Sequence, residues 1–164
     1  MMVSKMEIQT SRFGVLTASE DDLIRFPAGI IGFRDEKSFV LIPHGSSTHV
    51  GWLQSTSTPE LAFPVVSAHG LVDEYPDVAI TLAADRAGIG GNEDELAVLA
   101  VMTAPLQQPA TVNLLAPLIV NATTRTGAQV FLEGSRFSTQ ELFVPPRPHV
   151  SIAPVESGER AVSR

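Results

Sequence analysis

The chain has 164 residues, of which 44% are apolar, and its 18 acidic and 11 basic side chains give a formal charge of −7. This length and composition predict one globular domain whose core needs no disulfide or metal. The absence of cysteine excludes thiol catalysis and thiolate zinc sites. The negative charge disfavours direct binding of nucleic acid, because phosphates attract basic surfaces.

The apolar runs are too short to cross a membrane. The longest cover residues 96–102 and 114–120, whereas a spanning helix needs roughly 20 apolar residues. The first residues become polar at Ser4 and Lys5, and they lack the apolar block of a signal peptide. We therefore expect a cytoplasmic protein that makes no membrane contact.

Short segments rich in Val, Ile, Leu and Phe, separated by Gly, Pro, Ser or Asn, predict an all-β protein that forms a barrel or a sandwich. In the segment that begins at Met6, apolar and polar residues alternate, which predicts a strand with one wet face. The predicted strands are residues 6–11, 15–18, 23–26, 39–43, 50–55, 62–66, 78–82, 96–103, 111–115, 118–122 and 129–132.

Three connectors, residues 34–38, 58–61 and 83–89, are expected to form short helical turns, the last ending at Gly88. A hairpin tip is expected at Gly127 and Ala128. Trp52 lies among strand residues, so we expect its side chain to be substantially buried. Four prolines among polar residues near the end of the chain predict a domain over residues 1–142 and a disordered tail over residues 143–164.

The residues that carry chemistry form no catalytic, cofactor or metal motif. His44, His49, His69 and His149 have no compact ligand spacing, and no Gly-x-Ser-x-Gly is present. The glycine-rich run at residues 88–92 precedes three acids, which would repel a phosphate. We therefore expect a protein that is not an enzyme. The alternative is a small metal-dependent hydrolase or carbohydrate-binding β-barrel that uses His44, His49 and nearby carboxylates.

Acidic residues are concentrated in one part of the chain. Residues 73–95 contain seven acids and one base, and so contribute −6 of the net −7. Such a segment is either a solvated loop or a surface that attracts a basic partner. The candidate docking residues are Asp73, Glu74, Asp77, Glu93, Asp94 and Glu95.

Three blocks in a fixed order make the chain resemble the flagellar assembly factor FliW family. Residues 26–33 read Phe-Pro-x-Gly-Ile-x-Gly-Phe, residues 54–63 read Gln-Ser-x-x-x-Pro-Glu-Leu-Ala-Phe, and residues 113–117 read Asn-Leu-Leu-Ala-Pro. The resemblance extends over about residues 6–139.

This resemblance implies a small closed, mostly antiparallel β-barrel that acts by binding other proteins, without a cofactor. It implies a cytoplasmic chaperone that binds newly made flagellin and antagonises CsrA, a small basic dimer that binds RNA. When flagellin is exported, the freed protein would bind CsrA and lift its repression of messages that include the flagellin message. A third hypothesis, besides the family role and the hydrolase or carbohydrate-binding barrel, is an acidic RNA mimic with no flagellar role.

Overall fold

The computed structural model describes residues 4–45, 49–69, 71 and 75–144, except for the side chains of Asp77 and Val78. Its regular elements are eleven strands, one α-helix and one 3-10 helix. In chain order they are β1 (Lys5–Thr10), β2 (Gly14–Ser19), η1 (Glu20–Asp22), β3 (Ile24–Arg25), β4 (Ser38–Pro43), β5 (Val50–Ser55), β6 (Ala62–Ser67), α1 (Asp77–Arg86), β7 (Leu96–Thr103), β8 (Thr111–Val112), β9 (Leu118–Asn121), β10 (Thr126–Gln129) and β11 (Glu141–Leu142). No helix in these ranges is long and apolar enough to cross a membrane.

Seven of the strands form a closed barrel. They follow the order β7, β6, β5, β4, β3, β10 and β9, and β9 pairs back with β7 to close the ring. Every neighbouring pair in the ring is antiparallel except β3 and β10. The structure therefore confirms the small closed, mostly antiparallel barrel that the sequence predicted.

Large apolar side chains from around the ring fill the barrel. Phe26, Phe39, Leu53, Val65 and Leu118 are almost completely buried in one cluster. The rings of Phe26 and Phe39 meet edge to face, with centroids 5.6 Å apart. Because small barrels leave room only for their own side chains, this cluster is a packed core and not a channel.

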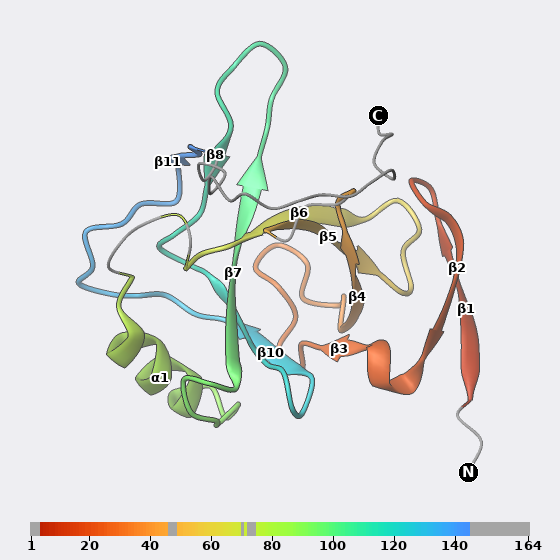
Figure 1. Ribbon diagram of the computed structural model, residues 1–164, viewed down its shortest axis with the longest axis horizontal. Helices are drawn as coiled ribbons and strands as arrows, with labels where there is room; N and C mark the ends of the chain where they lie inside the picture. The colour runs from red at the N-terminus through yellow and green to blue at the C-terminus, as the bar shows by residue number, and fades with distance from the viewer. Residues whose placement is uncertain (1–3, 46–48, 70, 72–74, 145–164) are drawn as a thin grey trace, which may run out of the picture.

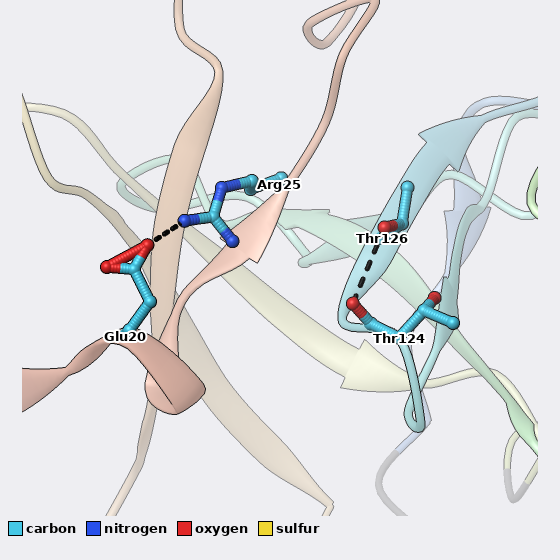
Figure 2. Close-up of polar contacts among 4 residues, drawn as sticks. All are labelled: Glu20, Arg25, Thr124 and Thr126. Carbon is cyan, nitrogen blue, oxygen red and sulfur yellow. Dashed lines mark hydrogen bonds and ion pairs between the residues drawn. The ribbon is translucent and has the colours of Figure 1, made fainter. Parts of the chain in front are cut away.

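The shortest strand pairing in the barrel is the join between β3 and β10. These strands share a single parallel pair, Thr126 with Arg25, next to a hydrogen bond of 2.9 Å from the Arg25 N–H to the Arg125 carbonyl. Figure 2 shows the ion pair between Arg25 and Glu20 at one side of this join, and the contact of 3.5 Å from the Thr126 hydroxyl to the Thr124 carbonyl at the other. Each of these two contacts lies within one side of the join, whereas the Arg125 guanidinium crosses it and donates to the Asp22 carbonyl at 3.0 Å.

Two elements cover the outside of the barrel on opposite sides (Figure 1). The β1–β2 hairpin packs Ile8 and Ala18 against Val40 of β4. On the other side, Ile80 and Ala84 of α1 pack in the cluster that contains Val98 of β7. In β1, Ile8 is buried between exposed Glu7 and Gln9, as the alternating pattern predicted.

One predicted strand is wrong. Residues 78–82 belong to α1, which continues through the first part of the predicted turn at residues 83–89 and ends before Gly88 at φ +80°. As a strand, this segment would place Ile80 and Leu82 on one face, but Ile80 is 3% exposed and Leu82 is 52% exposed. Burial of Ile80 together with Ala84, one helical turn later, outweighs the strand preference of the β-branched residues.

The end of the barrel also differs from the prediction. The hairpin turn occupies residues 122–125, where Arg125 adopts φ +60°, and Gly127 lies inside β10. A Cβ on Gly127 would lie 2.9 Å from the Phe26 ring, so glycine is needed there for close packing and not for a turn. The strand here, β10, occupies residues 126–129, so the predicted strand at residues 129–132 is wrong except at Gln129.

Three other strands differ from the prediction: two are shorter than predicted and one was not predicted. β3 and β8 contain two residues each, and β11 was not predicted. β11 pairs with β8, and the next residue, Phe143, packs against the cluster around α1. The rest of the predicted tail, residues 145–164, lies outside the described residues, so the domain boundary stays a prediction.

Candidate functional site

The three consecutive acids of the predicted docking surface lie in a tight turn before β7. The Asn92 carboxamide oxygen accepts the N–H groups of Asp94 and Glu95 at 2.9 and 3.2 Å. The Glu95 carboxylate accepts the Asn92 N–H at 3.1 Å and the Thr123 hydroxyl at 3.3 Å. Glu95 therefore holds the turn, whereas Glu93 and Asp94 are exposed and face solvent.

This turn lies opposite the first half of α1. Glu93 and Asp94 share a shallow hollow of about 170 Å³ with Ile80 and Thr81 of the helix. Of the other candidates, Asp77 is the first residue of α1, so the fold places its backbone on the helix that faces the turn. Asp73 and Glu74 lie outside the described residues.

The histidines of the alternative hypothesis do not form a metal site. The Nδ1 atom of exposed His44 accepts the Trp52 indole N–H at 3.4 Å. His49 and His69 are also exposed, and His149 lies outside the described residues. Within the described ranges, no three His, Cys, Asp or Glu side chains gather closely enough to hold a metal ion.

Most of the Trp52 side chain is covered, as the sequence predicted, although it is not fully buried. β5 places it on the outer face of the barrel. The Arg12 guanidinium lies 4.2 Å above its ring, and Phe13 meets it edge to face at 6.0 Å. The tip of the β1–β2 hairpin therefore covers Trp52.

The motif at residues 54–63 has a structural role. The Ser55 hydroxyl accepts the N–H groups of Ser57 and Thr58 at 3.1 and 2.9 Å, and donates to the Glu36 carboxylate at 2.5 Å. Thr58 and Ser57 donate two more hydroxyl bonds to Glu36 at 2.5 and 3.2 Å. These donors favour the ionised carboxylate, so they lower the pKa of Glu36, chiefly through Ser55.

Two more groups are tied into the fold by hydrogen bonds. The Ser19 backbone and side chain donate to Asp22 and lower the pKa of that carboxyl. Burial raises the pKa of Tyr75, whose hydroxyl donates to the Leu114 carbonyl at 2.7 Å. Tyr75 therefore stays neutral and serves to anchor the chain that enters α1.

A second surface, a groove between α1 and residues 130–133, was not predicted from the sequence. Leu82 and Phe131, on its opposite sides, are 52% and 55% exposed. The groove was missed because residues 78–82 were interpreted as a strand. The signal was present in the spacing of Ala79, Leu82, Ala83 and Arg86 by three or four residues, which places them on one helical face.

Comparisons with known proteins agree with the fold. The model of the family described as FliW protein matches residues 7–143. A protein of Heliobacterium modesticaldum named flagellar assembly factor FliW is 39% identical over 142 residues, which cover 85% of this chain and 92% of the relative. A protein of Geobacter sulfurreducens with the same name is 37% identical over 139 residues, covering 84% of this chain and 86% of the relative.

A solved structure gives the same result. The crystal structure of a flagellar assembly factor FliW superposes with a TM-score of 0.74 at 30% identity, covering 87% of this chain and 99% of that one. Residues 7–143, which the family model matches, include the barrel, α1 and the acidic turn before β7.

Proposed function

This chain belongs to the FliW family of flagellar assembly factors, and from that membership we propose that it binds flagellin in the cytoplasm and antagonises CsrA. The observation that carries the proposal is the family match over residues 7–143, nearly the whole described domain. In this proposal, flagellin occupies the protein until it is exported. The freed protein then binds CsrA and relieves its repression of flagellin synthesis.

The charge of the chain supports CsrA as one partner. The net charge is −7, and residues 73–95 contribute −6 of it as seven acids and one base. Glu93 and Asp94 are exposed beside α1. Because CsrA binds RNA, its surface is expected to be basic, and opposite charges steer two proteins together. Of the six candidate acids, we assign Asp73, Glu74, Asp77, Glu93 and Asp94 to this contact, and Glu95 to holding the turn that presents Glu93 and Asp94.

The proposed role requires no catalysis. The relatives are named for flagellar assembly and not for a reaction. The alternative hydrolase needs a converging set of ligands around His44 and His49, and the contact observed at His44 is a hydrogen bond from an indole. A binding protein therefore accounts for the described residues with fewer assumptions.

The test is direct binding of the purified full chain to flagellin and to CsrA from the same bacterium, by isothermal titration calorimetry. We expect each partner to bind, and we expect the CsrA affinity to fall between 50 and 300 mM salt, because screening shortens electrostatic attraction to about 8 Å at physiological ionic strength. Absence of heat with both partners would refute the proposal.

Charge variants distinguish the effect of the acidic surface on CsrA binding from the effect of net charge. Glu93→Lys with Asp94→Lys should weaken CsrA binding and flatten its salt dependence. Asp35→Lys with Glu60→Lys is the matched control, since both acids are exposed in other loops and the change in net charge is the same. Equal losses in the two double variants would show that only the net charge matters.

A further inference from the structure

A hollow of about 300 Å³ borders the barrel core and is lined in part from β6, β7 and β10. Its lining includes Phe63 and Val101, which pack against the barrel cluster. Ile31 and Phe131 also line it and are each 55% exposed. Gln129 holds this arrangement, since its Oε1 accepts the Ile31 N–H at 2.9 Å and its Nε2 donates to a backbone carbonyl at 2.9 Å. The hollow is therefore built into the fold and has an exposed apolar wall, a feature that commonly marks an interaction site.

The face on which the hollow opens continues in register to the last described residues. Paired residues of antiparallel strands place their side chains on the same face. Thr103, which lines the hollow, pairs with Thr111, and Thr111 pairs with Leu142. Leu142 and Val144 are 67% and 71% exposed, whereas the intervening Phe143 packs on the other side, against the cluster around α1. This alternation places Val144 on the face of the hollow.

The chain beyond Val144 is long enough to return to the hollow. Figure 1 shows β8 and β11 next to the end of β7. Val144 lies two strand spacings, about 10 Å, across the sheet from β7 and four residues, about 13 Å, along it from Asn113, which also lines the hollow. The separation is thus about 16 Å, whereas residues 145–152 span about 25 Å when extended. The excess length allows the chain to reverse its direction.

The sequence of this part of the chain is complementary to the hollow. Residues 149–155 read His-Val-Ser-Ile-Ala-Pro-Val, so an extended backbone presents Val150 and Ile152 on one face. Residues 145–164 contain three arginines and two glutamates, a net charge of +1, whereas residues 1–144 have a net charge of −8. Apolar side chains and an opposite charge therefore both favour contact of this segment with the rest of its own chain.

We propose that residues 149–155 bind back onto the hollow of the same chain, with the Ile152 side chain between Ile31 and Phe131. A short tether gives such a segment an effective concentration in the millimolar range, so a contact of about 1 mM affinity forms in about half of the molecules. The predicted tail is thereby held to the domain at one point. It is a removable cover for the apolar wall, and a partner that binds this wall must displace it. The inference does not depend on the proposed function.

The test uses a spin label on the full-length chain. Because the sequence contains no cysteine, Ser157→Cys provides a single site for a nitroxide, two residues after the proposed contact. The label weakens the nuclear magnetic resonance signals of nearby groups. The Ile31 and Val101 methyl groups report on the hollow, and the Ile8 methyl group, in the cluster beneath the β1–β2 hairpin, is the reference.

We expect the label to reduce the Ile31 and Val101 methyl signals by about half or more, because the contact forms in about half of the molecules. The Ile8 signal should keep its intensity. Ile152→Ser should restore the two weakened signals, whereas Val162→Ser, the matched change beyond the contact, should leave them weak. The proposal is wrong if the label affects all three methyl groups equally, or if Ile152→Ser leaves the loss unchanged.

Two further measurements identify the occupant. Ile31→Glu should shift the amide resonances of residues 149–155, whereas Leu106→Glu should not, because Leu106 is 91% exposed outside the hollow. Equal shifts in the two variants, or none with Ile31→Glu, would contradict the contact. When spin-labelled chain is mixed with isotope-labelled chain that has no nitroxide, the methyl signals should keep their intensity, since the contact forms within one chain. An equal loss in the mixture would assign the hollow to the tail of a second copy and overturn the proposal.

Discussion

Glu36→Gln should destabilise the barrel in a way that depends on pH. The Glu36 carboxylate accepts three hydroxyl hydrogen bonds, of 2.5 Å from Ser55, 2.5 Å from Thr58 and 3.2 Å from Ser57. They join the segment before β4 to the turn after β5. Glutamine keeps the size of the side chain and removes its charge, so the variant isolates the contribution of that charge.

The magnitude follows from the two short bonds. A hydrogen bond to a charged group stabilises by about 1.5–3 kcal/mol, and a neutral one by about 0.5–1.5 kcal/mol. The difference is about 1 kcal/mol per bond, and solvent around this partly exposed group reduces it. We therefore expect Glu36→Gln to lower the free energy of unfolding by about 1–2 kcal/mol at pH 7, and the melting temperature by about 4 °C for a domain of this size.

The sign of the pH dependence follows from the direction of the pKa shift. The folded protein holds the pKa of Glu36 below its ordinary value of 4.5. The unfolded chain therefore takes up the proton first as the pH falls, and the stabilisation is complete above pH 4.5. It disappears as the pH falls through the lowered folded pKa. The difference between wild type and Glu36→Gln should thus be constant from pH 6 to 8 and shrink below pH 4.5.

Urea unfolding, followed through the single tryptophan, measures this difference at pH 7 and pH 3. Glu60→Gln is the control, because Glu60 is exposed in the neighbouring turn and its substitution by glutamine removes the same charge. The reasoning fails if Glu36→Gln and Glu60→Gln are equally destabilising, or if the loss caused by Glu36→Gln is as large at pH 3 as at pH 7.

Three further predictions follow from packing and charge. Gly127→Ala should lower the free energy of unfolding by about 2 kcal/mol, because the added Cβ would lie 2.9 Å from the Phe26 ring and 3.1 Å from a backbone carbonyl. Calorimetry measures this loss, and an unchanged melting temperature would contradict the close packing. Trp52→Ala should lower the free energy of unfolding in urea by about 2 kcal/mol, less than the roughly 3–5 kcal/mol of a core aromatic, since the ring lies on the outer face and is not fully buried. A loss in the core range would contradict its place on the outer face. Glu93→Lys with Asp94→Lys should slow CsrA association in stopped-flow and leave dissociation nearly unchanged; a change confined to dissociation would contradict electrostatic steering.

The strands of the barrel were predictable where the sequence pattern reflects a buried face. β5 and β7 have the bounds that the pattern predicted, and each pairs with both neighbours in the ring over at least three residues, whereas β3 forms one pair with β10 and two with β4. The pattern failed at residues 78–82, where Ile80 packs on the barrel from a helix. Local sequence preference cannot report a contact with Val98, which is distant in the sequence, and such contacts decide between helix and strand here.

The candidate site was predictable in composition and not in geometry. The count of acids revealed residues 73–95 as a charged segment. It did not show that the Glu95 carboxylate accepts hydrogen bonds from Asn92 and Thr123. The second of these bonds depends on where the turn between β9 and β10 lies in the fold. The groove at Leu82 and Phe131 required the helix and the end of β10 to be placed side by side.

The most direct test of the proposed antagonism follows a fluorescent flagellin-message RNA bound to CsrA by anisotropy as the full chain is added. We predict that the chain releases the RNA, and that an excess of flagellin restores RNA binding because flagellin occupies the chain. If the RNA stays bound to CsrA at saturating chain, or if flagellin has no effect on its release, the central claim is contradicted.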